Sequence, residues 1–164
     1  MKYIYIVLGF GIIMSAGCYS FKGIAIPPNI KTYNVENFEN TAPSAPGDIN
    51  QRFSEALRAK IRNESRLIYS ELNPDLEFSG SISSFTLRPE APQAGNTVAL
   101  NRLDIVVSVT FTNTTDEKKS WKESFTFFRT FPSDQDFLSI QDALIAEIFK
   151  QLTENIFNKA FTGW

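Results

Sequence analysis

The residue of this chain with the most specific chemistry is Cys18, the single cysteine of the sequence. It follows Met14-Ser15-Ala16-Gly17, and a small pair such as Ala16-Gly17 before a cysteine is typical of a lipoprotein processing site. Processing at this point attaches diacylglycerol to the thiol and an acyl chain to the new amino group. The sequence therefore predicts a domain held to a membrane by covalent acyl and diacylglycerol groups on Cys18, with no other cofactor.

The remaining chemistry-bearing residues do not form a catalytic pattern. The chain contains no histidine, and its one thiol is assigned to the lipid anchor. Ser-His and Cys-His nucleophiles and histidine-based zinc sites are thereby excluded. The acidic pairs Asp116-Glu117 and Asp134/Asp136 lie in predicted loops, where solvated turns are the simpler interpretation. We therefore expect no enzyme, and the net charge of −2 offers no general attraction for nucleic acid.

Basic residues near predicted strand ends offer another kind of chemistry, the binding of phosphate or sugar-acid groups. Lys118 and Lys119 lie at a predicted hairpin tip, and Arg88, Arg102 and Arg129 lie on neighbouring strands. A phosphate site requires two or three of these groups to converge. Ordinary surface charge is the alternative interpretation.

Residues 1–17 have the parts of a signal peptide. Lys2 supplies a positive N-terminal region, and Tyr3 to Met14 form an apolar run of about a dozen residues. Because a membrane-spanning helix needs about 20 apolar residues, this run predicts a signal and not an anchor helix. The alternative is an ordinary secretory signal followed by an unrelated cysteine, since Ser15 stands where an aliphatic residue is usual.

Alternating hydrophobicity predicts four strands that position the basic residues. We expect them within residues 30–38, 76–87, 103–111 and 121–127, with the last two forming an antiparallel hairpin. In the second strand the large apolar residues change parity at Ser83-Ser84, which predicts a β-bulge.

Two amphipathic helices are also predicted. The first spans about residues 49–68, and the second begins at a capping box of Ser139 with Asp142 and runs to about Phe161. The element order β-α-β-β-β-α predicts an α+β fold, in which a four-stranded, largely antiparallel sheet carries two helices on one face. The expected parts are a signal peptide (1–17), a lipid-anchored stalk (18–29) and one α+β domain (30–164).

The first helix carries Arg58, Arg62 and Arg66 at intervals of four residues, which places them on one face. Glu55 and Glu64 are interleaved with them. The mixture of charges favours a solvated helix face over a binding ridge.

Several segments resemble the LptE-family lipoproteins of the Bacteroidetes type. The chain start after processing, Cys18-Tyr19-Ser20-Phe21-Lys22-Gly23, then Pro27-Pro28 and Val35-Glu36-Asn37-Phe38-Glu39-Asn40, is similar to the opening of that family. Two later segments, Leu76-Glu77-Phe78-Ser79-Gly80-Ser81-Ile82 and Ala99-Leu100-Asn101-Arg102-Leu103, are similar to it as well. The family fold, a four-stranded sheet with two helices, agrees with the fold expected from the hydrophobic pattern.

The resemblance implies an outer-membrane lipoprotein that plugs the β-barrel LptD, assists its assembly and helps to deliver lipopolysaccharide to the outer leaflet. LptD and lipopolysaccharide are the implied partners, and the expected location is the periplasmic side of the outer membrane or the barrel lumen. In the family, basic residues in loops and strand ends meet lipopolysaccharide phosphates. Lys118, Lys119, Arg102 and Arg129 are therefore the candidate contacts, although no motif transfers that role residue by residue. The alternative is a generic periplasm-facing lipoprotein that binds another envelope component.

Overall fold

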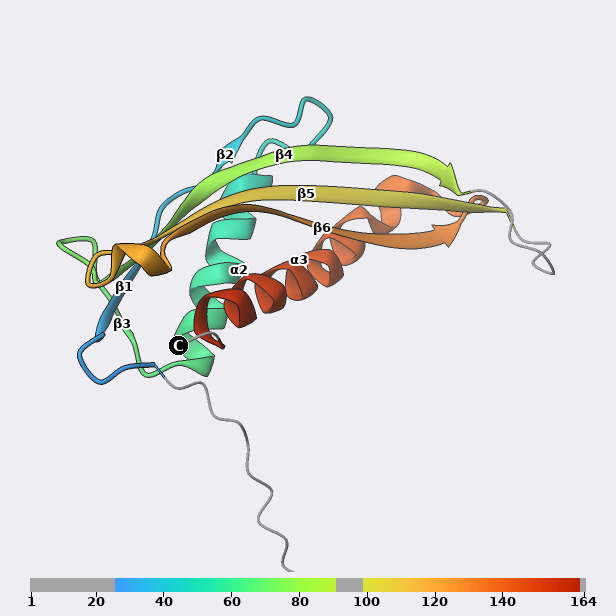
Figure 1. Ribbon diagram of the computed structural model, residues 1–164. Coiled ribbons are helices and arrows are strands. Elements are labelled where there is room, and N and C mark those ends of the chain that lie inside the picture. Colours follow the sequence, from blue (N-terminus) through green and yellow to red (C-terminus); the bar gives the residue numbers. More distant parts are fainter. Residues whose placement is uncertain (1–25, 91–98, 163–164) are drawn as a thin grey trace, which may run out of the picture.

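The computed structural model describes residues 26–90 and 99–162, so Cys18, the predicted signal peptide and most of the predicted stalk lie outside the described residues. The two helices pack on one face of a single sheet, which confirms the predicted α+β class (Figure 1). The elements in chain order are β1 (Thr32–Val35), β2 (Glu39–Asn40), α2 (Ile49–Glu64), β3 (Ile68–Tyr69), β4 (Leu76–Glu90), β5 (Leu100–Asn113), the 3-10 helix η2 (Glu117–Lys119), β6 (Trp121–Pro132) and α3 (Phe137–Phe161).

The sheet is mixed, with strand order β3-β1-β4-β5-β6 and β2 placed beside β4. The long strands β4, β5 and β6 pair antiparallel, as the sequence predicts. In contrast, β1 runs parallel to both β3 and β4, and β2 runs parallel to β4. The prediction of four strands missed β2 and β3 because strands of two residues are too short to show an alternating pattern.

The predicted bulge is present in β4. The register between β4 and β5 shifts between Ile82 and Ser84, which leaves Ser83 as the additional residue. An additional residue exchanges the two faces of a strand, so Ile82 and Phe85 are both buried under the helices. The bulge therefore allows one 15-residue strand to keep its apolar side on the core.

The first helix ends earlier than its hydrophobic pattern predicts. Glu64 is the last residue of α2, and the chain then turns so that the Ile68 N–H donates to the Lys31 carbonyl at 2.9 Å. As a result Leu67 is buried in the core whereas Ile68 is 70% exposed. Pairing with β1 satisfies backbone groups that a longer helix would have satisfied internally.

The second helix begins at a different cap from the predicted one. The Asp136 carboxylate accepts a hydrogen bond from the Ser139 N–H at 3.0 Å, so Asp136 is the N-cap and α3 starts at Phe137. The predicted capping box of Ser139 with Asp142 is wrong. Asp142 instead forms an ion pair with Arg52 of α2 at 2.8 Å, because it points toward the neighbouring helix.

Aromatic contacts and one ion-pair network join the two helices beneath the sheet. The Phe53 ring of α2 meets the Phe149 ring of α3 edge to face, with ring centroids 5.1 Å apart. Lys60 of α2 pairs with Glu154 of α3 and with Glu64. Burial alone would lower the pKa of Lys60, but the hydrogen bonds to the two carboxylates outweigh it and raise the pKa. These contacts fix α2 and α3 as one layer.

Gly80 lies against the backbone of β5. Its φ of 155° is in a region that residues with a Cβ rarely adopt, and a Cβ there would lie 2.0 Å from the Ser108 carbonyl oxygen. The Phe38 ring would be 2.9 Å away. Only glycine fits this position without backbone movement.

Replacing Gly80 with alanine is expected to lower the free energy of unfolding by about 3 kcal/mol or more, because both the backbone strain and the contact with Ser108 must be relieved. Urea unfolding followed by circular dichroism measures this loss. Gly47→Ala is the matched control, since no atom lies within 4 Å of a Cβ at Gly47. Equal stability of the two variants would contradict the close approach at Gly80.

Asp75 ties the start of β4 to the start of β1. Its Oδ2 atom accepts hydrogen bonds from the backbone N–H groups of Lys31 at 2.7 Å and Thr32 at 2.9 Å, and from the Thr32 hydroxyl at 3.1 Å. The two backbone hydrogen bonds lower the pKa of the Asp75 carboxyl. The ionised carboxylate therefore contributes stability at neutral pH.

Asp75→Asn is expected to reduce the free energy of unfolding at pH 7 by about 1 kcal/mol, because hydrogen bonds to a partly exposed charged acceptor are lost or weakened. A carboxyl with a lowered folded pKa stabilises the fold above its unfolded pKa, and this contribution disappears as the pH falls through the folded pKa. The difference between wild type and variant should thus shrink in unfolding curves recorded at progressively lower pH. Asp134→Asn, an exposed change in a turn, serves as the control, and a difference independent of pH would contradict the assignment.

Candidate functional site

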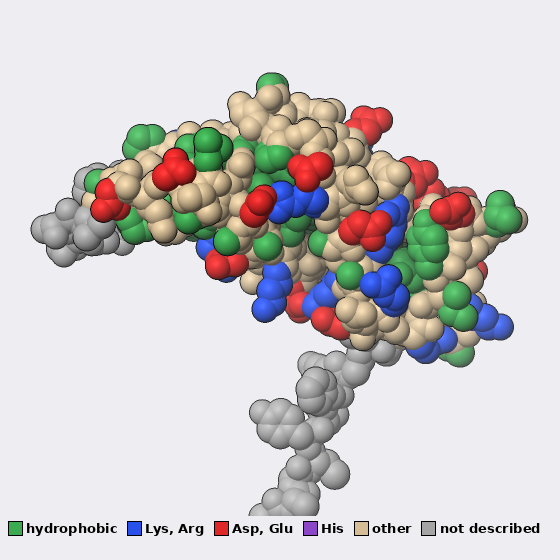
Figure 2. Space-filling view, turned by 180° about the vertical axis from the view of Figure 1, so that it is seen from behind, with side chains coloured by type: hydrophobic (Ala, Val, Ile, Leu, Met, Phe, Trp, Pro, Cys, Tyr) green, Lys and Arg blue, Asp and Glu red, His purple; other side chains and the backbone are tan. Residues whose placement is uncertain are grey.

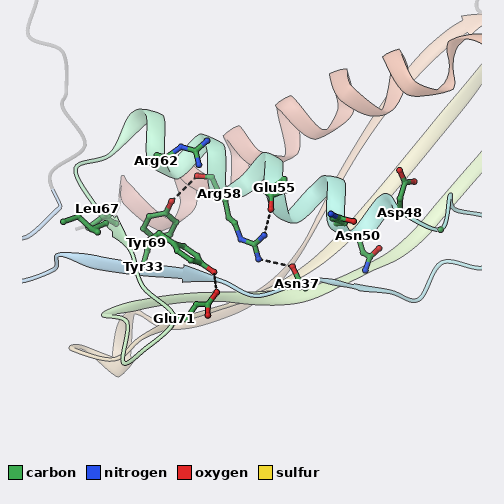
Figure 3. A pocket seen from close by; sticks show the side chains of 13 residues that line it. Tyr33, Asn37, Asp48, Asn50, Glu55, Arg58, Arg62, Leu67, Tyr69 and Glu71 are labelled. Carbon is green, nitrogen blue, oxygen red and sulfur yellow. Dashed lines mark hydrogen bonds and ion pairs between the residues drawn. The ribbon is translucent and has the colours of Figure 1, made fainter.

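A groove of about 1080 Å³ lies between α2 and the β1–β3 edge of the sheet. Figure 3 shows Arg58 on α2 with its guanidinium turned toward Glu55 and Asn37, and Tyr33 of β1 and Tyr69 of β3 beside the helix. The floor is apolar and aromatic, and the rim carries Asn, Gln and acidic side chains. We call this hollow the α2 groove.

Arg58 is held rigidly inside the α2 groove. Its guanidinium donates to the Val35 carbonyl at 2.7 and 3.1 Å, to the Asn37 Oδ1 atom at 3.0 Å and to the Glu55 carboxylate at 2.7 Å. It thereby supplies two donors to a carbonyl at the end of β1. The predicted face of three arginines is therefore divided, because Arg58 has a structural role.

The other two arginines of that face differ from Arg58. Arg66 lies beyond the end of α2 and donates to the carbonyls of Ile26 at 3.0 Å and Pro27 at 2.6 Å, which fastens the chain that leads in from the N-terminus. Arg62 is exposed and forms no ion pair with the described residues. The sequence spacing gave no sign of this division, since it depends on where α2 ends.

The α2 groove contains Tyr33, whose hydroxyl is partly buried. Burial raises the pKa of the Tyr33 hydroxyl, an effect that the nearby Arg62 only partly opposes, and this hydroxyl donates to the Arg58 carbonyl at 3.2 Å. Tyr33 therefore keeps its proton at neutral pH and acts as a hydrogen-bond donor. Within residues 26–90 and 99–162, no cluster of three acidic, cysteine or histidine side chains is placed to hold a metal ion.

The face of the sheet turned away from the helices is covered by neither α2 nor α3 (Figure 1). We call it the open face, and it presents the alternate side chains of β4, β5 and β6. Ser81, Ser108 and Ser124 are neighbours across the three strands, and the Ser108 and Ser124 hydroxyls are 3.0 Å apart. A row of hydroxyl groups across adjacent strands offers donors and acceptors to water or to a polar partner.

Arg102, one of the predicted lipopolysaccharide contacts, lies on the open face within a charge network. It pairs with Asp104 at 2.8 Å and approaches Glu90 at 3.7 Å, while its guanidinium carbon lies 3.5 Å from the centre of the Phe128 ring. Arg88 also contacts Asp104, at 3.1 Å. The hydrogen bond with Asp104 raises the pKa of Arg102. The two arginines are matched by two carboxylates, so the network has no net charge.

Arg129, another predicted contact, points to the opposite side of the sheet. Its guanidinium pairs with Glu147 of α3 at 2.8 Å and lies 4.7 Å from the centre of the Phe127 ring. Arg102 of β5 is paired with Thr130, the residue next to Arg129, so the two backbone positions are close. Their side chains nevertheless lie on opposite faces of the sheet.

Lys118 and Lys119, the remaining predicted contacts, lie in η2 at the other end of the long strands. About eleven residues of β5 separate their end from Arg102, which corresponds to roughly 36 Å. Together with Lys159 of α3 they line a hollow of about 420 Å³ whose apolar walls include Phe111 and Trp121. We call this the lysine hollow. The structure thus brings Lys118 and Lys119 together with a third lysine but does not bring them near Arg102 or Arg129.

Lys159 was missed by the sequence prediction because it is 40 residues from the hairpin tip and lies on a helix. It reaches the hollow because α3 runs back beneath the start of β6, where it also pairs with Glu123 at 3.0 Å. The Lys118 ammonium, in contrast, forms no ion pair with the residues that the structure describes. On the face seen in Figure 2, Lys and Arg side chains lie interspersed with Asp and Glu, so that face carries no broad basic patch.

No helix formed by the described residues is long and apolar enough to span a membrane.

Comparisons with solved structures identify the same fold in other bacterial proteins. The hypothetical protein CT253 from Chlamydia trachomatis has a TM-score of 0.54 and 9% identity, with coverage of 80% of this chain and 98% of that chain. Protein XCC0632 from Xanthomonas campestris has a TM-score of 0.52 and 13% identity, with coverage of 80% and 84%. The rare lipoprotein B from Shewanella oneidensis has a TM-score of 0.47 and 13% identity, with coverage of 76% and 91%.

No curated protein sequence matches the chain. The family described as LptE, lipopolysaccharide-assembly, matches residues 30–160, which is most of the chain and nearly the whole folded region. The chain therefore belongs to the LptE family of lipopolysaccharide-assembly lipoproteins, which are structural proteins rather than enzymes.

Proposed function

We propose that this protein is an outer-membrane lipoprotein, anchored through acyl and diacylglycerol groups on Cys18, that plugs an LptD-type β-barrel and assists its assembly. In this role it takes part in moving lipopolysaccharide to the outer leaflet. The observation that carries the proposal is the LptE-family match over residues 30–160, which includes every strand that the structure describes and nearly all of α2 and α3.

The open face supports a location inside a wet barrel. A wide membrane barrel has a polar interior, so a plug must present polar groups to it without exposing its own core. The hydroxyls of Ser81, Ser108 and Ser124 and the neutralised network around Asp104 meet this requirement. The apolar sides of the same strands are covered by α2 and α3 and are therefore unavailable for such contacts.

The lipid anchor supports the same role by raising the local concentration of the protein. Acyl chains on Cys18 would confine the domain to the membrane that holds its partner, so that binding becomes effectively intramolecular. Arg66 fastens residues 26 and 27 to the domain, so the chain between Cys18 and the fold is only a few residues long.

For lipopolysaccharide itself, we propose the lysine hollow as the first contact with phosphate. Lys118 and Lys119 supply positive charge beside an aromatic wall, and Lys159 adds a third ammonium group, which also pairs with Glu123. Arg102 and Arg129 remain predicted contacts, but each already pairs with carboxylates of the chain, so phosphate must compete with Asp104 or Glu147 there.

The proposal predicts that tagged, full-length protein purified from detergent-solubilised outer membranes carries a large LptD-type barrel in a one-to-one ratio. Mass spectrometry of the co-purified proteins, with quantification of each band, makes this measurement. Recovery of the protein alone, or with a different envelope component, would contradict the plug role and favour the generic periplasm-facing lipoprotein.

Charge reversal at Lys118 and Lys119 (Lys118→Glu with Lys119→Glu) is expected to weaken binding of purified lipopolysaccharide by the detergent-solubilised full-length protein roughly three- to tenfold. This range follows from the loss of two exposed ion pairs that together contribute about 0.7–1.4 kcal/mol. Lys122→Glu is the matched control, because Lys122 is exposed at the same end of β6 but belongs to the open face. Unchanged binding in the double variant, or an equal loss in the control, would remove the lysine hollow as the contact.

A further inference from the structure

Three apolar side chains are exposed close together at one end of the molecule. Ile68 is 70% exposed, Tyr69 41% and Leu72 83%. They are three of the six large apolar side chains that are exposed in the described parts of the chain, and all three lie within five consecutive residues. Single apolar residues are normal on a protein surface, but a cluster marks an interaction site. We call these three residues the β3 patch.

The turn that carries Leu72 is fixed by hydrogen bonds. The Ser70 N–H donates to the Tyr33 carbonyl at 2.9 Å, and the Ser70 hydroxyl donates to the Leu72 carbonyl at 3.0 Å. Further along, the Thr114 hydroxyl donates to the Pro74 carbonyl at 3.1 Å. Leu72 is therefore held outward on an ordered support, so an apolar partner can bind it without first ordering the turn.

The β3 patch lies beside the point where the chain enters the domain. The Ile68 N–H donates to the Lys31 carbonyl, and Arg66, two residues before Ile68, donates to the Ile26 carbonyl at 3.0 Å. Cys18 precedes Ile26 by eight residues, and an extended chain covers at most about 3.6 Å per residue, so the two are within about 29 Å of each other. Acyl chains on Cys18 would thus keep this end of the domain near the bilayer.

We propose that the β3 patch inserts into the surface of the phospholipid bilayer that holds the anchor. This inference rests on the proposed acylation of Cys18. Ile68 and Leu72 enter the boundary between headgroups and acyl chains, and Tyr69, with an apolar ring and a polar hydroxyl, suits the same depth. The acyl chains alone tether the domain without orienting it, whereas this second contact fixes which end of the domain meets lipid.

The charged residues around the β3 patch are mixed in sign. They are Lys31, Arg62, Arg66, Glu64, Glu71 and Asp75. Such a mixture offers little net attraction to anionic headgroups. On the face seen in Figure 2, hydrophobic side chains stand out among charged ones at the end of the molecule where β1 and β3 lie. Insertion of apolar side chains is therefore the main contribution, and binding should change little when anionic lipid is omitted.

Contact with lipid at this end leaves the open face available to a barrel. Leu76 of β4 pairs with Tyr33 of β1 and with Asn113 of β5, so the β3 patch lies at the end of the long strands that also carries the lysine hollow. Thr86 lies ten residues further along β4, which corresponds to roughly 30 Å. The lipid contact and the plug role therefore use different parts of the molecule.

Fluorescence quenching in vesicles tests the contact. The full-length processed protein, with acylation of Cys18 checked by mass spectrometry, is placed in phosphatidylcholine vesicles that carry a nitroxide quencher just below the headgroups. Leu72→Cys, labelled with a solvent-sensitive dye, should be quenched at least about twofold more strongly than the same label at control positions. Its emission should also shift to shorter wavelength, because the dye leaves water.

Two control positions separate lipid contact from tethering. Asn63→Cys is exposed and lies three residues before Arg66, but it lines the hollow between α2 and α3. Leu138→Cys is 75% exposed but lies at the start of α3, next to Phe137, whose ring contacts Phe85 near the far end of β4. Equal quenching at Leu72 and Asn63 would mean that the tether alone brings this end to the bilayer, and the proposal would be overturned.

Removal of the apolar side chains gives a second test. With the dye at Asn29→Cys, an exposed position in the turn before β1, the pair Ile68→Ser with Leu72→Ser should lower quenching to the level of the Asn63 label. Circular dichroism and the melting temperature should stay unchanged, because both side chains are exposed. Leu138→Ser is the matched control and should leave the quenching unaltered. Quenching that survives loss of both side chains would contradict insertion of the patch.

The assay contains no barrel, so its outcome is independent of the plug role. A processed protein without acyl chains would overturn the anchor and this inference together. An acylated protein whose Leu72 label is not quenched would overturn this inference alone.

Discussion

Burial of the sheet on one face only is the constraint on which the rest of this structure depends. The strands β4, β5 and β6 are long, and both helices pack on the same side of them (Figure 1). The additional residue Ser83 keeps the apolar side of β4 on that side beyond the bulge, and Gly80 allows β4 to approach β5 and Phe38. A complete core on one side leaves the other side free to be polar.

This division separates the functions that we assign to the molecule. The helix side supplies stability through the Phe53–Phe149 contact and the Lys60 network. The open side supplies hydroxyl groups and a neutralised charge network suited to a wet lumen, while the lysine hollow lies at one end of the strands. Three lysines gather at the lysine hollow, which suits contact with phosphate groups in a chain of negative net charge.

Local patterns predicted most of the fold because they extend over many residues. The alternation in β4 to β6, the bulge at Ser83-Ser84 and the two helical stripes all arise from neighbours in the sequence. The parallel pairing of β1, β2 and β3 could not be predicted, because it depends on backbone partners that are distant in the chain. The cap at Asp136 was missed because the sequence offers two possible cap residues close together, Asp136 and Ser139. The same limit applies to the site: Lys118 and Lys119 were found as a local pair, but Lys159 joins them only through packing of α3.

The central claim is that the open face meets the barrel, and site-specific photo-crosslinking in intact outer membranes tests it most directly. A photoreactive residue at Thr86, exposed on the open face, should give an adduct with a large LptD-type barrel. The same residue at Asn63, exposed on α2, should give little or none. Adducts from Asn63 and none from Thr86 would contradict the account, because the helix side would then be the surface that meets the barrel.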